Sequence, residues 1–405
     1  MNANLFKSAI AALALLVAFN SCKKEETKFH IEATCNPEEG TVTGGGEYVE
    51  GENATITAIA NPGYCFERWV GYAYATEDSV ITIPVRNNMS ISAIFSKIVS
   101  SEYGSVKISV SQEGGYYIYE ARPNENCYLL KWSDGSHELL KMYVSAEQNL
   151  TATFKPYPEG SIHALFSVGI GKRVIFSKGN LQFNPTLGTH TRADGTIAPG
   201  TWRFAEAQTD IIADDTVISA TYDGWIDDFA WGTSGWSGSG ATYYQPYDGY
   251  NCGSRSEIAD SVNKLFGPQG EYNLTDDYAY ADWGVYNPIS NGGNKTGMWR
   301  TLTKDEFYSI KNTPELIFED RIYGYVFGFD WDILWNINTI NELSNHNEIL
   351  YLINNIYEEY WTASCSKSST GCALTCNPVN IFNGITFNDY RSVRHPVRLV
   401  MDVDE

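Results

Sequence analysis

The sequence predicts a mainly β N-terminal part made of two small repeats, followed by an irregular, loop-rich α+β domain. Three observations support this fold class. Two similar segments occur one after the other before residue 158. Each ends in apolar residues at alternate positions, which is the period of a half-buried strand. The remainder mixes short strand-like and helix-like runs with long loops rich in glycine and aromatic residues.

Length and charge limit the class of protein further. With 405 residues the chain is long enough for about two to three domains. Its formal net charge is −21 at pH 7. A chain this acidic repels a phosphate backbone, so we do not expect nucleic acid as a partner. The aromatic fraction of 14% suits both a β-rich extracellular fold and a wet binding surface.

Residues 1–21 have the order of a secretory signal peptide. Lys7 provides the positive charge, and residues 9–19 form an apolar run that is too short to span a bilayer comfortably. The run leads to Ser21-Cys22, and this order resembles the lipobox of bacterial lipoproteins. In that family the cysteine is lipidated and becomes the new N-terminus. The resemblance implies that Cys22 carries the lipid and that the protein contacts the membrane only through this anchor.

Residues 22–29 are the predicted lipidated tether. Lys24 is followed by Glu25 and Glu26, which resembles a surface-export signal of some Gram-negative bacteria. The alternative is that these charges only keep the tether solvated. Together with the lipobox resemblance, the motif leads us to expect a protein that is anchored in the outer membrane and exposed on the cell surface.

Residues 30–98 and 99–157 are two predicted repeat modules, the second of them degenerate. The first copy opens near Gly40 and has a later segment that ends in Trp69. The second copy opens near Gly104, and its matching segment ends in Trp132. The last strand of each copy alternates apolar and polar residues, with Met89, Ile91, Ala93 and Phe95 on one face in the first copy and Leu150, Ala152 and Phe154 in the second. This layout resembles the internalin-type B-repeat, a small β-grasp-like module common in bacterial surface proteins. The resemblance implies a stalk or spacer.

Residues 158–405 are the third and largest predicted unit. Strand-like runs occur at residues 166–168, 174–181, 202–205, 360–364 and 397–400. Residues 254–265 are a candidate helix, and residues 344–359 show the apolar spacing of a helix.

The stretch 281–306 has a clear local pattern in the middle of this unit. Turn residues at 287–294 precede a short buried segment, and Thr303 with Glu306 predicts a capping box at the start of a helix. We expect Trp283 and Trp299 to pack in the core.

A series of motifs extends over residues 163–401 in the order FSKGNLQ, WRFAE, GWIDDFAWGTSG, ADWG, ISNGG, WRTLTKDEF, YWTAS and VRLV. Together they resemble a family of bacterial surface lipoprotein domains with a C-type-lectin-like fold, distantly similar to the formylglycine-generating-enzyme fold. In that family an apolar strand precedes the YWTAS-like motif. Here the periodicity of residues 349–357 predicts a helix in its place.

The eight cysteines leave seven if Cys22 is lipidated. Disulfides form in exported proteins. Cys35 and Cys65 are candidates for a bridge, and Cys65 and Cys127 occupy matching positions in the repeats, which favours a buried thiol for Cys127. Cys365, Cys372 and Cys376 cluster near the C-terminus, which favours one disulfide and a spare thiol. A thiolate metal site with His395 is the alternative.

The sequence contains no nucleophile elbow, P-loop or dinucleotide fingerprint. We therefore predict neither an enzyme nor a bound cofactor. Carboxylates such as Asp227 and Asp228 would suit a glycosidase pair, but in so acidic a chain we expect them at the surface. Calcium is the alternative cofactor, because oxygen ligands on loops suffice for it. Its candidate ligands are Asn388 and Asp389, since FND resembles the Trp-Asn-Asp calcium motif of lectins.

The glycine-rich region from residue 222 holds the candidate ligand-binding residues. Aromatic faces stack on sugar rings, and loops expose them. Trp225 and Trp231 lie within the family motif, and we expect them in the core. The candidates outside that motif are Trp236, Tyr243, Tyr244 and Tyr247. We therefore expect a glycan or a surface protein as partner. The alternative is a structural or adhesive surface component without a small ligand.

Overall fold

In the computed structural model the chain divides into two units, Met1–Lys155 and Pro156–Glu405, which we call the N-terminal and the C-terminal unit. The structure describes residues 26–71, 76–111, 115–144, 147–212, 219–237, 246, 273–310, 315–319, 322–327, 350–354, 360–365, 372–376, 386–390 and 394–403. Within these ranges the architecture is mainly β, with several small sheets and few helices, as predicted. None of the helices in the described ranges is both long and apolar enough to cross a membrane.

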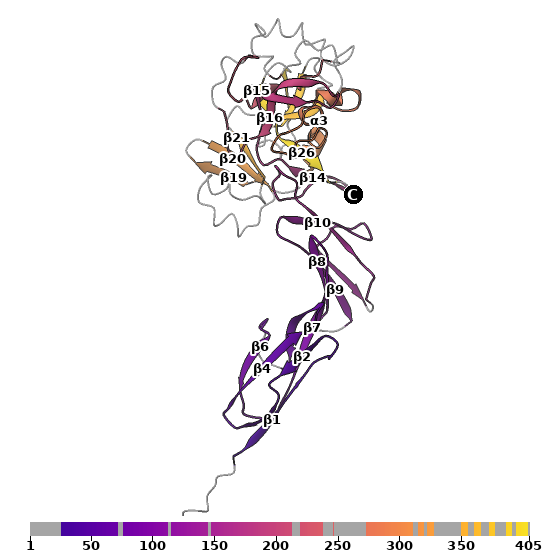
Figure 1. The fold of residues 1–405 in the computed structure, drawn as a ribbon, viewed down its shortest axis with the longest axis vertical. Coiled ribbons are helices and arrows are strands. Elements are labelled where there is room, and N and C mark those ends of the chain that lie inside the picture. The colour runs from indigo at the N-terminus through magenta and orange to yellow at the C-terminus, as the bar shows by residue number, and fades with distance from the viewer. Residues whose placement is uncertain are drawn as a thin grey trace, which may run out of the picture. The chain divides into compact units, whose positions relative to one another are not determined.

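The described part of the N-terminal unit is built of strands (Figure 1). The first repeat contains β1 (Lys28–Thr34), β2 (Gly40–Thr43), β3 (Gly46–Val49), β4 (Asn53–Ala60), β5 (Tyr64–Val70), β6 (Val80–Pro84) and β7 (Met89–Ser100). The second contains β8 (Gly104–Val110), β9 (Tyr116–Pro123), β10 (Cys127–Trp132), β11 (Leu140–Val144) and β12 (Ala152–Pro156).

One sheet runs through both repeats, because β7 of the first pairs antiparallel with β8 of the second. Its strand order is β11-β9-β8-β7-β1-β3, and β5 also pairs with β7. The pair β1–β7 is parallel. Strands β2, β4 and β6 form a second sheet, and β10 pairs with β12. The two repeats are therefore joined by backbone hydrogen bonds between strands as well as by the covalent connection of the polypeptide.

Alternation along the strands produces the two repeat cores. Ile91, Ala93 and Phe95 of β7 are buried, as predicted for that face. In the second repeat Phe154 is buried, and Ala152 on the same face is half-buried. In a half-buried sheet, alternate side chains face the core. The period-two pattern is therefore confirmed in both copies.

The second repeat keeps the contacts of the first in spite of its divergent sequence. Gly40 lies against the Phe95 ring and Gly104 against the Phe154 ring, so that an added Cβ would come within 2.4 and 2.7 Å of ring carbons. The indole of Trp69 donates to a backbone carbonyl at 3.0 Å, and that of Trp132 does so at 2.7 Å.

The predicted equivalence of Cys65 and Cys127 is off by one residue. The amide of Tyr64 donates to the carbonyl of Asn61, and the amide of Cys127 donates to that of Asn124 in the same way. Cys127 therefore matches Tyr64. We expected the Cys127 thiol to be buried, but the residue is only half-buried.

The predicted bridge between Cys35 and Cys65 is not formed, and each is a free thiol. The Cys35 thiol donates to the carbonyl of Gly40 instead.

The C-terminal unit contains many short elements (Figure 1). Its strands are β13 (Phe166–Gly169), β14 (Lys172–Phe176), β15 (Leu181–Thr191), β16 (Ile197–Phe204), β17 (Asp228–Ala230), β18 (Arg300–Thr301), β19 (Glu315–Glu319), β20 (Ile322–Phe327), β21 (Leu350–Asn354), β22 (Tyr360–Cys365), β23 (Cys372–Cys376), β24 (Thr386–Tyr390), β25 (Arg394–Pro396) and β26 (Leu399–Asp402). The helices are η1 (Asp276–Ala281), α3 (Trp283–Tyr286) and α4 (Lys304–Ser309).

Five small sheets organise these strands, with the orders β13-β14-β26-β18, β15-β16, β17-β25, β19-β20-β21 and β22-β23-β24. The first sheet joins the start of the unit to its end, because β14 pairs with β26. The predicted strand over residues 174–181 is interrupted: β14 ends at Phe176 and β15 begins at Leu181. Gly179 lies between them, where an added Cβ would come within 2.5 Å of the carbonyl of Ala205.

Fully buried tryptophans form the centre of this unit. Trp283 and Trp299 are in the core as predicted, and so is Trp231. Trp299 and Trp231 donate their indole N–H groups to the carbonyls of Gly292 and Thr362, each at 2.8 Å. A buried indole usually finds such a partner, but among the described residues the indole N–H of Trp283 has none.

The helix predicted over residues 344–359 is wrong where the structure describes it. Residues Leu350–Asn354 form β21, which pairs antiparallel with β20 from Leu350 opposite Phe327 to Asn354 opposite Tyr323. A short apolar run is compatible with either element, and its pairing partner decides between them. The helix predicted over residues 254–265 lies outside the described residues.

Candidate ligand-binding site

The capping box predicted at residue 303 is confirmed. The Thr303 hydroxyl accepts from the amide of Glu306 at 3.3 Å, and the Glu306 carboxylate accepts from the amide of Thr303 at 2.9 Å. The same carboxylate belongs to a larger ionic network that borders a pocket of about 680 Å³.

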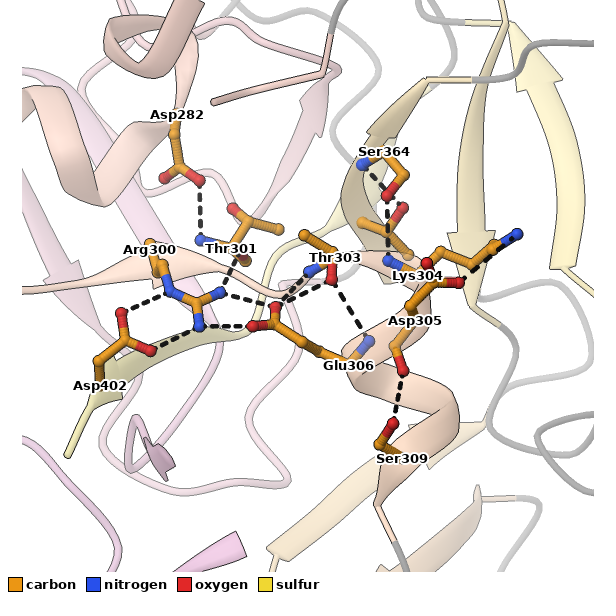
Figure 2. A network of polar contacts seen from close by, with 11 residues as sticks. Asp282, Arg300, Thr301, Thr303, Lys304, Asp305, Glu306, Ser309, Ser364 and Asp402 are labelled. Carbon is orange, nitrogen blue, oxygen red and sulfur yellow. Dashed lines mark hydrogen bonds and ion pairs between the residues drawn. The ribbon is translucent and has the colours of Figure 1, made fainter. Parts of the chain in front are cut away.

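Figure 2 shows Arg300 in this network between two carboxylates. Its guanidinium donates to Glu306 at 2.8 Å through two nitrogens and to Asp402 at 2.7 and 2.5 Å. Burial by itself raises the pKa of Glu306, but the bonds from Arg300 and Thr303 outweigh it, so the pKa lies below its ordinary value. The charges of Arg300, Glu306 and Asp402 are thus paired with one another, and the network joins β18, α4 and β26.

Asp282 borders the same pocket and is fully buried. Burial raises the pKa of its carboxyl to about 6. A raised pKa in a pocket is typical of catalytic carboxylates. Here, however, one carboxylate oxygen accepts from the amide of Gly284 at 3.1 Å and the other from that of Thr301 at 2.8 Å. We therefore assign Asp282 a structural role: it caps α3 and holds β18.

A second surface gathers aromatic rings around Trp236, the one predicted binding aromatic that the structure describes. Trp236 lies 6.3 Å from Tyr278 and 6.2 Å from Tyr280 between ring centroids, both edge to face. Tyr280 lies 5.3 Å from Tyr286. We call these four residues the aromatic strip. Edge-to-face pairs at such distances are favourable.

Exposure differs along the aromatic strip. Tyr280 is 38% exposed, and Trp236 is half-buried with part of its ring against the tryptophan core. Tyr286 is buried. The Ser234 hydroxyl donates to the carbonyl of Tyr280 at 2.6 Å, so the loop that carries Trp236 is tied to η1. The exposed ring of Tyr280 and the half-buried ring of Trp236 are therefore held in place before any ligand arrives.

The strip ends at the turn between β15 and β16, where Arg192 lies. Its guanidinium carbon is 5.5 Å from the centre of the Tyr286 ring. The Tyr286 hydroxyl donates to Asp194 at 2.8 Å, and the amide of Ala193 donates to the carbonyl of Tyr286 at 2.9 Å. Gly235 makes room for Arg192, since an added Cβ would come within 2.5 Å of a guanidinium nitrogen. Three separate segments thus meet at this turn.

A pocket of about 490 Å³ opens beside the turn, and we call it the hairpin pocket. Arg192, Lys295, His190 and Asn294 line it together with threonines, and the described lining residues include no carboxylate.

His190 is held by two acceptors in the wall of the hairpin pocket. Its Nδ1 lies 2.8 Å from the carbonyl oxygen of Gly200, and its Nε2 lies 3.0 Å from Oδ1 of Asn287. Burial lowers the pKa of His190, the two bonds oppose this in part, and Arg192 lowers the pKa further.

Trp225 differs from the expectation of a core residue, because it is only half-buried. The guanidinium carbon of Arg203 lies 3.7 Å from the centre of its ring, within the range of a cation–π contact. Arg203 is in turn oriented by Gln182, to which its Nε donates at 2.9 Å.

The other predicted site residues are distributed as follows. Cys22, Tyr243, Tyr244 and Tyr247 lie outside the described residues. Asn388 and Asp389 lie on β24, paired with Leu374 and Ala373, and their side chains are not described. Cys365 is buried on β22, Cys372 and Cys376 end β23, and His395 is buried on β25 beside Trp361.

Sequence reasoning missed Tyr278, Tyr280, Tyr286 and Arg192. The Tyr-Ala-Tyr spacing ahead of the ADWG motif was the available signal for two of them. No pattern in the sequence indicated Arg192, because the residues that contact it lie in segments far from it along the chain.

Comparison with known proteins identifies the first repeat. Residues 31–99 match the family model described as the divergent InlB B-repeat domain. Neither the curated proteins nor the solved structures contain a match to the chain. The matched domain is of a surface or adhesive type, and the second repeat shares its Gly–Phe and Trp–carbonyl contacts.

Proposed function

We propose that this protein is a lipid-anchored cell-surface protein whose C-terminal unit binds a glycan and whose N-terminal repeats act as a stalk. The observation that supports it is the aromatic strip, in which the exposed ring of Tyr280 stands beside the half-buried ring of Trp236. Aromatic faces provide apolar area at a low cost in side-chain entropy, because the rings have few rotatable bonds. The C-type-lectin-like resemblance of the motif series agrees with such a role.

The rings are suited to a sugar because polar groups surround them. Sugar rings present an apolar face and a rim of hydroxyl groups, so a sugar site combines ring faces with a few placed hydrogen-bonding groups. The threonines and Asn294 of the hairpin pocket provide such groups at the far end of the aromatic strip. Because Ser234 and Asp194 fix the strip on both sides, binding would require little further ordering.

A glycan array tests this proposal with the full chain purified in detergent. We expect Trp236→Ala and Tyr280→Ala each to weaken binding to the selected glycan by about 10-fold or more, the loss of one good ring contact. Tyr116→Ala is the matched control, since Tyr116 is 40% exposed in the N-terminal unit. Unchanged binding in both strip variants, or silence of the folded protein across the array, would contradict the proposal.

The anchor is tested separately. Cys22→Ala should move the protein from the membrane fraction to the soluble fraction and abolish incorporation of a labelled fatty acid. Several acyl chains on one residue hold a protein stably, at about 0.8 kcal/mol for each buried methylene. A Cys22→Ala protein that still fractionates with membranes and takes up label would refute this part of the proposal.

A specific observation favours one alternative, an adhesive component that pairs through its sheet edge. Strand β11 is one edge strand of the long sheet within the described residues, and β3 is the other. Leu140 and Met142 on it are 54% and 58% exposed. An exposed apolar edge strand is a template for pairing with another chain. Met142→Lys should then abolish self-association in sedimentation experiments, whereas Val110→Lys, an exposed position on an inner strand, should not. A protein that remains monomeric at every concentration would exclude this alternative.

A further inference from the structure

We infer that the hairpin pocket binds the anionic group of an acidic glycan, a carboxylate or a sulfate, with Arg192 as its main contact. This inference rests on the proposed glycan binding and names the class of sugar. It starts from a contrast of charge. The whole chain has a formal net charge of −21, yet two cations, Arg192 and Lys295, line the pocket, and no carboxylate of the described residues does.

Arg192 differs from the other oriented arginines in what it does with its donors. Arg300 is paired with two carboxylates, and Arg398 donates to Gln208 at 2.7 Å. Arg192 makes no ion pair with any residue that the structure describes. Its buried Nε has no hydrogen-bond partner there, as is also true of the Nε of Arg398. What sets Arg192 apart is that its guanidinium lies over the ring of Tyr286 and lines a pocket. A guanidinium held on a ring face offers its remaining N–H donors as a fork, which matches a carboxylate or sulfate in geometry and charge.

Asp194, the acidic residue next along this turn, attracts Arg192 electrostatically but is bonded to other groups. Asp194 accepts bonds from the hydroxyl of Thr196 at 2.7 Å, the amide of Thr196 at 2.9 Å and the hydroxyl of Tyr286 at 2.8 Å. These bonds, together with the nearby charge of Arg192, lower the pKa of Asp194. Its carboxylate holds the turn and Tyr286 through these bonds, so the N–H donors of Arg192 remain available to a ligand in the pocket.

Lys295 supplies the second cation from the loop opposite the hairpin. It is exposed, and no ion pair is found for it among the described residues. Asn294 beside it has a left-handed backbone, with φ of 49°, and its amide donates to the carbonyl of Ile289 at 2.9 Å. This turn places the lysine at the pocket. Two cations from two elements converge there, and threonine hydroxyls remain for the uncharged oxygens of a sugar.

The aromatic strip gives the ligand its direction. Contacts lead from Trp236 through Tyr280 and Tyr286 to Arg192. A glycan with one ring against Trp236 and Tyr280 would extend toward the hairpin pocket, where its acidic group would meet the guanidinium. The pocket, about 490 Å³, is large enough for one sugar ring with its substituent.

Binding of three polysaccharides to the full chain in detergent tests the inference at about 0.15 M salt, where exposed charges more than about 8 Å apart are screened. The probes are polygalacturonic acid for the carboxylate, dextran sulfate for the sulfate and dextran as the neutral polymer. We expect binding to one or both acidic polymers. Arg192→Gln should weaken it by about 10-fold or more, equivalent to about 1.4 kcal/mol, and Lys295→Gln by less. Arg192→Lys should restore part of the affinity, since it keeps the charge without the fork.

Lys172→Gln is the matched control, because Lys172 is an exposed lysine at the Arg300 pocket. It should bind like the parent protein. Equal affinity of the parent and Arg192→Gln for both acidic polymers would overturn the inference, as would the absence of any acidic binding. Binding to neutral glycans that depends on Trp236 alone would leave the proposed function standing while this inference fails. If neither neutral nor acidic glycans bind, both fail.

Discussion

His190 and Asn287 are joined by a hydrogen bond of 3.0 Å between Nε2 and Oδ1, and this contact connects the hairpin pocket to the buried core. The amide nitrogen of Asn287 donates to the carbonyls of Ser234 and Trp283 at 2.9 and 3.1 Å, which fixes the orientation of the amide. Its oxygen must therefore face His190. Because both ring nitrogens of His190 meet acceptors, only the protonated ring can donate to both.

The first prediction concerns Asn287. Asn287→Asp keeps the shape of the side chain. It replaces the amide nitrogen, which donates two hydrogen bonds, with a carboxylate oxygen that faces the same two carbonyl oxygens. We expect a loss of about 2–4 kcal/mol in the free energy of unfolding, since a buried charge and two unmatched carbonyls result. The new carboxylate should also raise the pKa of His190. Denaturation followed by tryptophan fluorescence measures the first effect, and NMR titration of the ring measures the second. Asn294→Asp, at an exposed position with a left-handed backbone that aspartate also adopts readily, should change stability by less than about 0.5 kcal/mol.

The second prediction concerns Asp282 and pH. Its pKa in the folded protein is raised from 3.8 to about 6 by burial. Between these values the folded state binds the proton more tightly than the unfolded state, so the contribution to stability is full below pH 4 and is lost as the pH rises through 6. The stability of the parent relative to Asp282→Asn, which does not titrate, should fall by up to about 3 kcal/mol from pH 4 to 7. Urea unfolding of both proteins at several pH values measures it. A difference that stays constant with pH would show that Asp282 is not perturbed.

The third prediction concerns Glu306, which both caps α4 and pairs with Arg300. Glu306→Ala should lower the free energy of unfolding by about 1–3 kcal/mol, because it removes the cap and leaves Arg300 with one partner. Asp305→Ala next to it is the control, since the Asp305 side chain is 89% exposed and should contribute little. Equal stabilities of the two variants in urea unfolding would contradict the assignment of the network as structural.

The fourth prediction concerns the glycines beneath the phenylalanine rings. Gly104→Ala would place a methyl group within 2.7 Å of the Phe154 ring and 2.8 Å of the Arg122 carbonyl. Overpacking of this kind should cost about 1–3 kcal/mol. Hydrogen exchange measured by mass spectrometry should show faster exchange across β8 and β9. Ser105→Ala, one residue on and half-buried, should leave exchange unchanged. If the second repeat did not share the packing of the first, the two variants would behave alike.

The local features of the sequence were the ones that could be predicted. The capping box at Thr303 and Glu306 depends on two residues three positions apart, so the local sequence by itself indicates it. The face of Ile91, Ala93 and Phe95 depends on alternation within one strand. Residues 350–354 show the limit of such reasoning, since their apolar spacing fits a helix and their pairing with β20 makes them a strand.

The candidate binding surface was predictable only in part. Trp236 was named as a candidate because it lies among glycines outside the family motif, and its role in binding stays a prediction. Trp225 lies within the motif, yet the contact with Arg203 on β16 leaves it half-buried. The exact alignment of the two repeats was also not predictable. The sequence suggests that Cys65 corresponds to Cys127, but the hydrogen bonds to Asn61 and Asn124 show that the alignment differs by one residue.

By itself the sequence determined the repeat architecture, the cap, the tryptophan core and the mainly β class, because each follows from periodicity, turn chemistry or apolar content over short distances. Only the tertiary structure decided which charges are available. Arg300 and Arg192 look alike in the sequence, but folding brings two carboxylates to Arg300 and a tyrosine ring to Arg192. The energy of a charge depends on the groups within a few ångströms of it, and those groups come from segments far apart in the chain.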